Sequence, residues 1–115
     1  MTILEKAIKY LNSCGVKTYG EKPHRDVPDN FCVVEKTGGG WQNHVDSATI
    51  ALQSYAKSKR EAETLNEITK KHMLAWAEKD TNISKCALNT DYDFTDPTEK
   101  QYRWQAIWDV VFFND

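Results

Sequence analysis

Apolar residues recur at helical spacing in two stretches, one at the start of the chain and one after residue 58. Each stretch begins at a helix-capping signal. Thr2 precedes the first stripe and Glu5 follows three residues later, which is the spacing of a capping box. That helix is predicted to stop at residues 12–15, where Gly15 suits the left-handed closing conformation.

The second predicted helix begins after Ser58, with Glu61 again three residues on, and it ends near Lys79. Its apolar positions are expected to form one buried stripe, made of Ala62, Leu65, Ile68 or Thr69, His72 and Trp76. The basic residues on this helix alternate with acidic ones, which is typical of a solvated helix face.

Apolar and β-branched runs predict five strands, over residues 16–19, 31–36, 45–55, 83–92 and 102–113. The order is helix, three strands, helix, two strands. We therefore expect an α+β fold in which a mostly antiparallel sheet of about five strands carries two helices on one face. No linker or repeat interrupts the chain, so residues 1–115 are predicted to form a single domain.

A glycine-rich segment follows the second predicted strand. Thr37, Gly38, Gly39 and Gly40 are expected to open a flexible loop at the tip of a long hairpin, because glycine permits positive φ. The arms are long enough to carry this tip beyond the body of the domain. Residues 20–30, which include two prolines, are predicted to form an extended surface loop.

Charge and cysteine usage narrow the function classes. With 15 basic and 17 acidic residues the net charge is −2, which argues against tight, sequence-independent binding to duplex DNA. The three cysteines, Cys14, Cys32 and Cys86, are widely spaced and form no Cys-x-x-Cys pair, so we expect reduced thiols rather than a metal site. No signal segment or membrane-length apolar run is visible, and we expect the protein to be made and kept inside the cell.

Catalytic and metal-binding patterns are weak throughout. His72 lies on the apolar helix stripe and is interpreted as a core-edge residue, whereas His24 and His44 flank the hairpin without a carboxylate or thiol at a recognisable offset. Asp91, Asp93 and Asp96 lack the spacing of a calcium loop. The triple glycine is not followed by the helix that a phosphate cradle needs. We therefore expect no enzymatic activity, no cofactor and no bound metal.

Three segments carry a family resemblance. The run from Phe31 to Gly40 resembles a strand-and-loop signature of small neck and tail-completion proteins of long-tailed bacteriophages. The stretch from Thr49 to Ala62 is similar to their next strand and helix start, and Asp96-Pro97 leading into residues 102–106 is similar to their ending. The order of elements also resembles that of the related tail terminator family. The aromatic-rich last strand departs from the family pattern.

The resemblance implies a structural protein of a phage or prophage that forms a ring, expected to be a homo-hexamer, on the head-proximal end of the tail tube. Such a ring would terminate tail growth and support head–tail joining. Its implied partners are further copies of itself, the tail tube protein and the head–tail connector proteins, with no sequence-specific nucleic acid and no membrane. The implied location is the host cytoplasm during assembly and then the tail or neck of the virion.

The candidate contact residues are those of the hairpin loop and of the 20–30 loop: Thr37, Gly38, Gly39, Gly40, Trp41, Gln42, Asn43, His24 and Arg25. Trp41 either anchors a partner or folds back over the sheet. The 20–30 segment is either a second contact or an ordinary surface loop. A non-enzymatic adaptor module unrelated to virion assembly is the alternative function, and it differs because a ring protein must offer two complementary surfaces.

Overall fold

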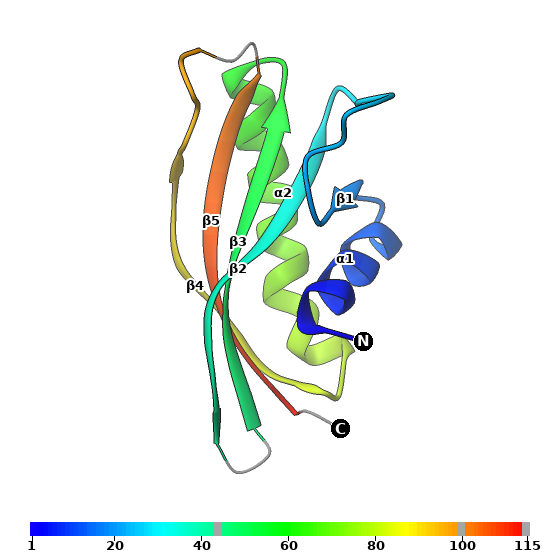
Figure 1. Ribbon diagram of the computed structural model, residues 1–115, viewed down its shortest axis with the longest axis vertical. Helices are drawn as coiled ribbons and strands as arrows, with labels where there is room; N and C mark the ends of the chain where they lie inside the picture. The colour runs from blue at the N-terminus through cyan, green and yellow to red at the C-terminus, as the bar shows by residue number, and fades with distance from the viewer. Residues whose placement is uncertain (43–44, 99–100, 114–115) are drawn as a thin grey trace.

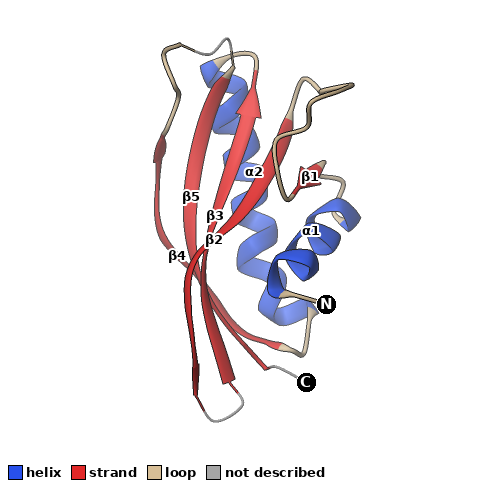
Figure 2. Cartoon of the chain, viewed as in Figure 1, coloured by secondary structure: helices blue, strands red, loops and turns tan. Residues whose placement is uncertain are grey.

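The computed structural model describes residues 1–42, 45–98 and 101–113, and the side chains of Trp41 and Gln42 are not among those described. Figure 1 traces the elements along the chain, and Figure 2 separates helices from strands. In order they are α1 (Ile3–Ser13), β1 (Thr18–Tyr19), β2 (Phe31–Gln42), β3 (Val45–Ala56), α2 (Lys59–Lys79), β4 (Ile83–Asp93) and β5 (Tyr102–Phe113). This is the order that the hydrophobic pattern predicts.

The strands form one sheet of five in the order β1-β2-β3-β5-β4. Every neighbouring pair is antiparallel except β1 and β2, which run parallel with Thr18 opposite Cys32. The α+β class and the mostly antiparallel sheet are therefore confirmed, and the sheet is mixed only at β1. A parallel neighbour requires the chain to travel back along the sheet, and residues 20–30 provide that return.

Both helices cover the same face of the sheet, where the main core lies (Figure 2). The largest buried side chains on this side come from α1, α2 and the three central strands: Leu11, Met73, Trp76, Val34, Ile50, Leu52, Trp108 and Val110. The predicted alternation along β3 is confirmed, since Ala48, Ile50 and Leu52 all belong to this core.

The predicted helix ends are confirmed. The Thr2 hydroxyl accepts from the Glu5 N–H, and the Glu5 carboxylate accepts from the Thr2 N–H, which completes the capping box. Ser58 caps α2 by accepting from the Glu61 N–H at 3.1 Å. Gly15 has φ 87°, the left-handed conformation expected after α1.

The predicted buried stripe of α2 is partly wrong. Ile68 is 43% exposed, while Asn66 and Met73 are fully buried together with Ala62, Thr69 and Trp76. The buried residues of α2 follow one another at spacings of three and four residues throughout. A search for apolar residues alone could not reveal this stripe, because one of its members is an asparagine. The amide nitrogen of Asn66 donates to Asp91 Oδ2 at 2.9 Å, which offsets part of the cost of burying this side chain, whereas Asn66 Oδ1 has no hydrogen-bond partner in the described chain.

The glycine-rich loop was predicted wrongly as well. Gly38, Gly39 and Gly40 lie inside β2, opposite Thr49, Ala48 and Ser47 of β3, after a bulge between Lys36 and Gly38. Among the described glycines only Gly15 has positive φ. The reason is close backbone approach rather than left-handed geometry, since a Cβ on Gly39 would lie 2.7 Å from the Ser47 carbonyl oxygen.

Candidate partner-binding surfaces

The β2–β3 hairpin forms one end of an elongated molecule with principal extents of 45 × 24 × 23 Å. Its strands pair from Phe31 opposite Tyr55 to Gln42 opposite Val45. Figure 1 shows this end of the hairpin reaching past both helices, as the lengths of the two arms predict. The connecting residues, Asn43 and His44, lie outside the described part of the chain.

The predicted contact residues 37–42 therefore belong to a strand. Thr37, Gly38, Gly39 and Gly40 are exposed, and the Thr37 hydroxyl donates to the Thr49 carbonyl at 3.3 Å. Trp41 and Gln42 are the last residues of β2, and the two interpretations of Trp41 concern a side chain outside the described set. What the segment offers a partner is strand backbone carrying small side chains.

The 20–30 segment lies toward the opposite end of the molecule from the hairpin tip (Figure 1). His24 and Arg25 are exposed, and His24 borders an open cavity of about 710 Å³ together with Tyr19, Lys22 and Pro23. The structure does not bring these residues together with residues 37–42. His44, the other loop histidine, lies outside the described part of the chain.

A second, smaller cluster of buried side chains, which the sequence did not reveal, lies on the sheet face away from the helices and contains Phe31, Val33 and Tyr55. There Phe31 of β2 stacks on Tyr55 of β3, with ring centroids 4.8 Å apart, and Tyr19 of β1 meets the Phe31 ring edge-on. Arg103 of β5 places its guanidinium 5.7 Å from the Tyr55 ring and 4.4 Å from the Phe94 ring.

A chain of side-chain hydrogen bonds extends from these rings across three strands. Arg103 Nη1 donates to the Tyr55 hydroxyl at 3.1 Å, and Tyr55 in turn donates to Gln53 Oε1 at 3.3 Å. Gln53 Nε2 donates to Gln105 Oε1 at 2.9 Å, and Gln105 Nε2 donates to the Tyr92 hydroxyl at 2.6 Å. Gln53 and Gln105 are buried here although no helix covers them, and the hydrogen bonds offset the cost of that burial.

We call Arg103, Tyr55, Gln53, Gln105 and Tyr92 the polar chain. The signal for it was present in the sequence as residues two apart within a strand, which share a face. Tyr55 and Gln53 have this spacing, as do Arg103 and Gln105. Which strands lie side by side depends on the sheet order, and the residue pattern does not give that order.

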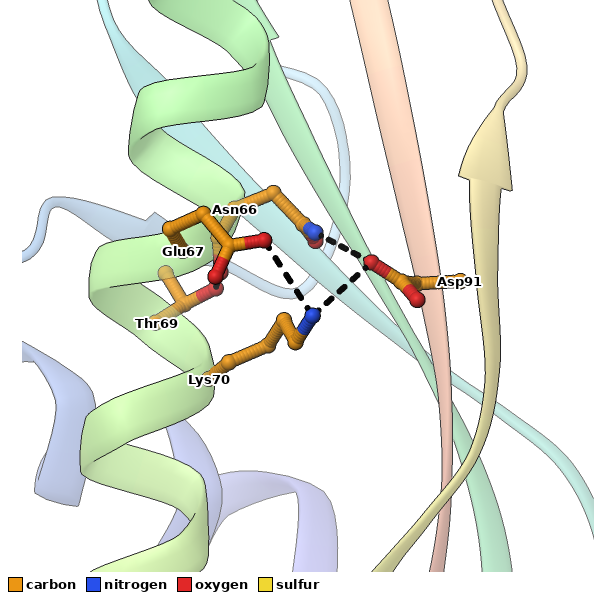
Figure 3. A network of polar contacts seen from close by, with 5 residues as sticks. All are labelled: Asn66, Glu67, Thr69, Lys70 and Asp91. Atoms are coloured by element: carbon orange, nitrogen blue, oxygen red, sulfur yellow. Dashed lines mark hydrogen bonds and ion pairs between the residues drawn. The ribbon is translucent and has the colours of Figure 1, made fainter.

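A second polar network joins α2 to the edge strand β4 behind the sheet (Figure 3). Lys70 Nζ lies 3.2 Å from both Glu67 Oε1 and Asp91 Oδ2, and Asn66 donates to the same Asp91 oxygen. Burial disfavours the Lys70 charge, but the hydrogen bonds to Asp91 and Glu67 outweigh it and raise the pKa of Lys70. This network holds a helix against a strand, so we assign it to stability.

The cysteines and histidines have surroundings that suit packing. All three cysteines are free, and burial raises the pKa of the Cys32 and Cys86 thiols to about 12. His72 is half-buried, and its backbone carbonyl accepts from the Tyr10 hydroxyl. Within residues 1–42, 45–98 and 101–113, no group of three His, Cys, Asp or Glu side chains is arranged to hold a metal ion. In the same part of the chain, no helix has the length and apolar composition of a membrane span.

Comparisons with known proteins identify no relative of this chain. No protein-family model matches the chain, and no curated protein is significantly similar to it.

Proposed function

We propose that the protein is a structural component of a phage or prophage tail, which assembles as a ring at the head-proximal end of the tail tube. In this role it terminates tail growth and supports head–tail joining. The observation that carries the proposal is the pair of open sheet edges at the hairpin end of the molecule. The resemblance of residues 31–40 and 49–62 to tail-completion proteins supplies the biological setting.

The two edges are complementary in direction. Four strands, β2, β3, β5 and β4, alternate in direction across the sheet, so β2 and β4 run opposite to one another. When copies stand side by side in the same orientation, β4 of one copy therefore faces β2 of the next in antiparallel sense. A closed ring requires this kind of head-to-tail contact between two different surfaces.

The two edges also lie at the same level along the strand direction. On its outer side β2 pairs with β1 only at Cys32 and Val33, so residues 38–42 have no strand partner there within the described chain. Following the register through β3 and β5, Gly38 is level with Ala87 and Gly40 with Lys85. Both ends of a head-to-tail contact would thus lie at the same level of the molecule.

Bulges interrupt both edges, between Lys36 and Gly38 in β2 and at two positions of β4. Natural proteins use bulges to limit uncontrolled pairing of open edges. We therefore expect the ring to form on the tail tube, which would align the copies, rather than in dilute solution. The tail tube protein and the head–tail connector proteins are the proposed partners of the two ring surfaces.

Electron microscopy of particles made without this gene tests the proposal. We expect overlong or headless tails in the deletion strain of the source phage or prophage, and normal particles when the wild-type protein is supplied. A Gly38→Lys/Gly40→Lys variant should fail to rescue because charged side chains on an edge strand oppose pairing. The Gly38→Ala/Gly40→Ala variant is the matched control and should rescue.

Normal, infectious particles in the deletion strain would refute the assembly function. The adaptor function would then take its place, and the observation that favours it is the pair of exposed aromatic side chains Tyr92 and Phe94 at the edge of the helix-free sheet face. Equal rescue by the lysine and alanine variants would leave tail assembly standing but refute contact through the β2 edge.

A further inference from the structure

The polar chain on the uncovered sheet face has a direction. A guanidinium can only donate hydrogen bonds, so the Tyr55 oxygen accepts from Arg103 and the single Tyr55 hydroxyl hydrogen donates to Gln53. The amide groups of Gln53 and Gln105 continue in the same donor-to-acceptor direction, because each accepts a hydrogen bond through its oxygen and donates one through its nitrogen. The chain ends at Tyr92, whose oxygen accepts from Gln105.

The Tyr92 hydroxyl is consequently left as a donor. Its hydrogen has no acceptor among the residues that the structure describes, and the side chain is 39% exposed. Hydrogen bonds arranged head to tail polarise one another, which strengthens the donor at the end of the chain. Because this chain begins at a permanent cation, the polarisation favours an acceptor that carries negative charge.

Phe94 lies beside the Tyr92 ring, and the Arg103 guanidinium lies over the Phe94 ring, 4.4 Å from its centroid. Arg103 Nε donates to the Phe94 carbonyl at 2.9 Å and Nη1 donates to the Tyr55 hydroxyl at 3.1 Å, so the position of the guanidinium is held. The other N–H groups of the guanidinium have no acceptor in the described chain. The Phe94 ring is 41% exposed and packs edge-on against Tyr92 at 5.7 Å. Tyr92, Phe94 and Arg103, which we call the donor patch, combine hydrogen-bond donors with an exposed apolar ring.

The nearby carboxylates do not occupy the donor patch. Asp93 accepts from the Thr95 hydroxyl and N–H, and lies 3.8 Å from Lys59 Nζ. Asp96 accepts from the Thr98 N–H and hydroxyl; these bonds, together with the charge of Arg103, hold the pKa of Asp96 below its usual value, and no hydrogen bond joins Asp96 to Arg103 in the described chain. These two acids make the surroundings unfavourable for a polyanion such as a nucleic acid, which is bound by several cations together. A single carboxylate with an apolar neighbour fits both the donors and the surroundings.

We propose that the donor patch is a binding site for an aspartate or glutamate side chain of a protein partner, with an adjacent apolar side chain packed on Phe94. Arg103 and Tyr92 donate to the carboxylate oxygens. Tyrosine and arginine are, with tryptophan, the residue types enriched among those that contribute most to binding at protein interfaces. The site goes beyond ring assembly and does not depend on it.

Solution NMR of the intact, isotope-labelled protein tests this with the capped tripeptide acetyl-Leu-Asp-Leu-amide and its Asn counterpart. We expect the Asp peptide to shift the backbone signals of residues 92–94 and 103–105 and the Arg103 Nε–H signal. The Asn peptide should bind about tenfold more weakly, since hydrogen bonds to a charged group are stronger than neutral ones. Equal shifts with both peptides, or shifts confined to other residues, would overturn the proposal.

Two substitutions distinguish binding at the donor patch from a general effect of positive charge on peptide binding. Arg103→Gln should abolish the response, whereas Lys71→Gln, which removes one positive charge from an exposed position on α2, should leave it intact. If Arg103→Gln does not fold, Tyr92→Phe serves in its place and should weaken binding severalfold while keeping the ring. Equal loss with Lys71→Gln, or larger shifts at the same residues with a single-stranded oligothymidylate, would refute a carboxylate site.

Discussion

Replacing the glycines of β2 one at a time distinguishes a strand held by close backbone approach from a flexible glycine loop. Gly39 is the sensitive position, because a Cβ there would lie 2.7 Å from the Ser47 carbonyl oxygen and 3.0 Å from Lys36 Cε. Gly38 is its matched control, since the nearest atom to a Cβ at that position is Thr49 Cβ at 3.9 Å. Both glycines belong to the same strand and have no positive φ.

The expected effects have opposite signs. Where the native conformation tolerates alanine, a Gly→Ala change stabilises by about 0.4–1 kcal/mol because it restricts the unfolded chain. Gly38→Ala should follow that rule. At Gly39 the contact is with a backbone carbonyl, which cannot rotate away, and overpacking of this kind costs about 1–3 kcal/mol. Gly39→Ala should therefore be net destabilising, by about 1.3 kcal/mol at the middle of these ranges and at most about 2.6 kcal/mol, after the same entropic gain is subtracted.

Urea and thermal unfolding of the two variants and the wild type measure the difference. The midpoints of the two variants should differ by several degrees, at roughly 4 °C per kcal/mol for a domain of this size. If Gly38→Ala and Gly39→Ala are equally stable, the close approach at Gly39 is wrong. If both are strongly destabilised, the glycines are required for positive φ, and the loop predicted from the sequence is correct after all.

Three further predictions concern the core and the β4 edge. The buried thiols of Cys32 and Cys86, whose pKa values are raised to about 12, should react with a disulfide reagent only after unfolding, whereas half-exposed Cys14 reacts in the native protein. Asn66→Ala should destabilise by about 1.5–3 kcal/mol in urea unfolding because it removes a hydrogen bond to a carboxylate, and Thr64→Ala, at an exposed position, should have almost no effect. Hydrogen bonds from Thr95 hold the pKa of Asp93 below its usual 3.8, so its contribution is present above that value and lost as pH falls below it. The stability difference between wild type and Asp93→Asn should accordingly shrink between neutral and acid pH, and a constant difference would contradict this assignment.

Short-range sequence signals predicted the helix starts and the core face of the central strand correctly. The capping pairs placed the start of both helices, and the alternation of Ala48, Ile50 and Leu52 identified the core face of β3. These signals work because they depend on neighbours within one helix turn or one strand. The pattern failed at Asn66, whose burial depends on Asp91 from a strand that follows the helix in the chain.

Gly38, Gly39 and Gly40 show a different limit. Three consecutive glycines are compatible with a turn and with a strand whose partner comes unusually close, and propensity favours the turn. The outcome depends on the position of the Ser47 carbonyl on the partner strand. Residues 37–42 consequently lie in a strand and not in the predicted loop, and their contact with a partner stays a prediction.

The donor patch was not predictable in the same way, because its residues become neighbours only through the sheet order. Arg103 and Tyr92 are opposite ends of a polar chain that passes through β3, and β3 precedes both in sequence. A charge count finds nothing there, since one arginine among nearby acids leaves no basic patch.

The two proposed surfaces occupy different parts of the molecule, and this separation has a consequence for affinity. Pairing of β2 with β4 would use strand edges at the hairpin end, while the donor patch lies on the sheet face near the start of β5. Assembly would therefore leave every donor patch free and repeat it around the ring. One carboxylate contact of this kind is weak, but a partner that is itself repeated would engage several at once, and linked binding raises the overall affinity by about 10²–10⁴ without any new contact. A weak single site is what such an arrangement needs, because the unassembled chain would then bind the partner poorly and the completed ring would bind it firmly.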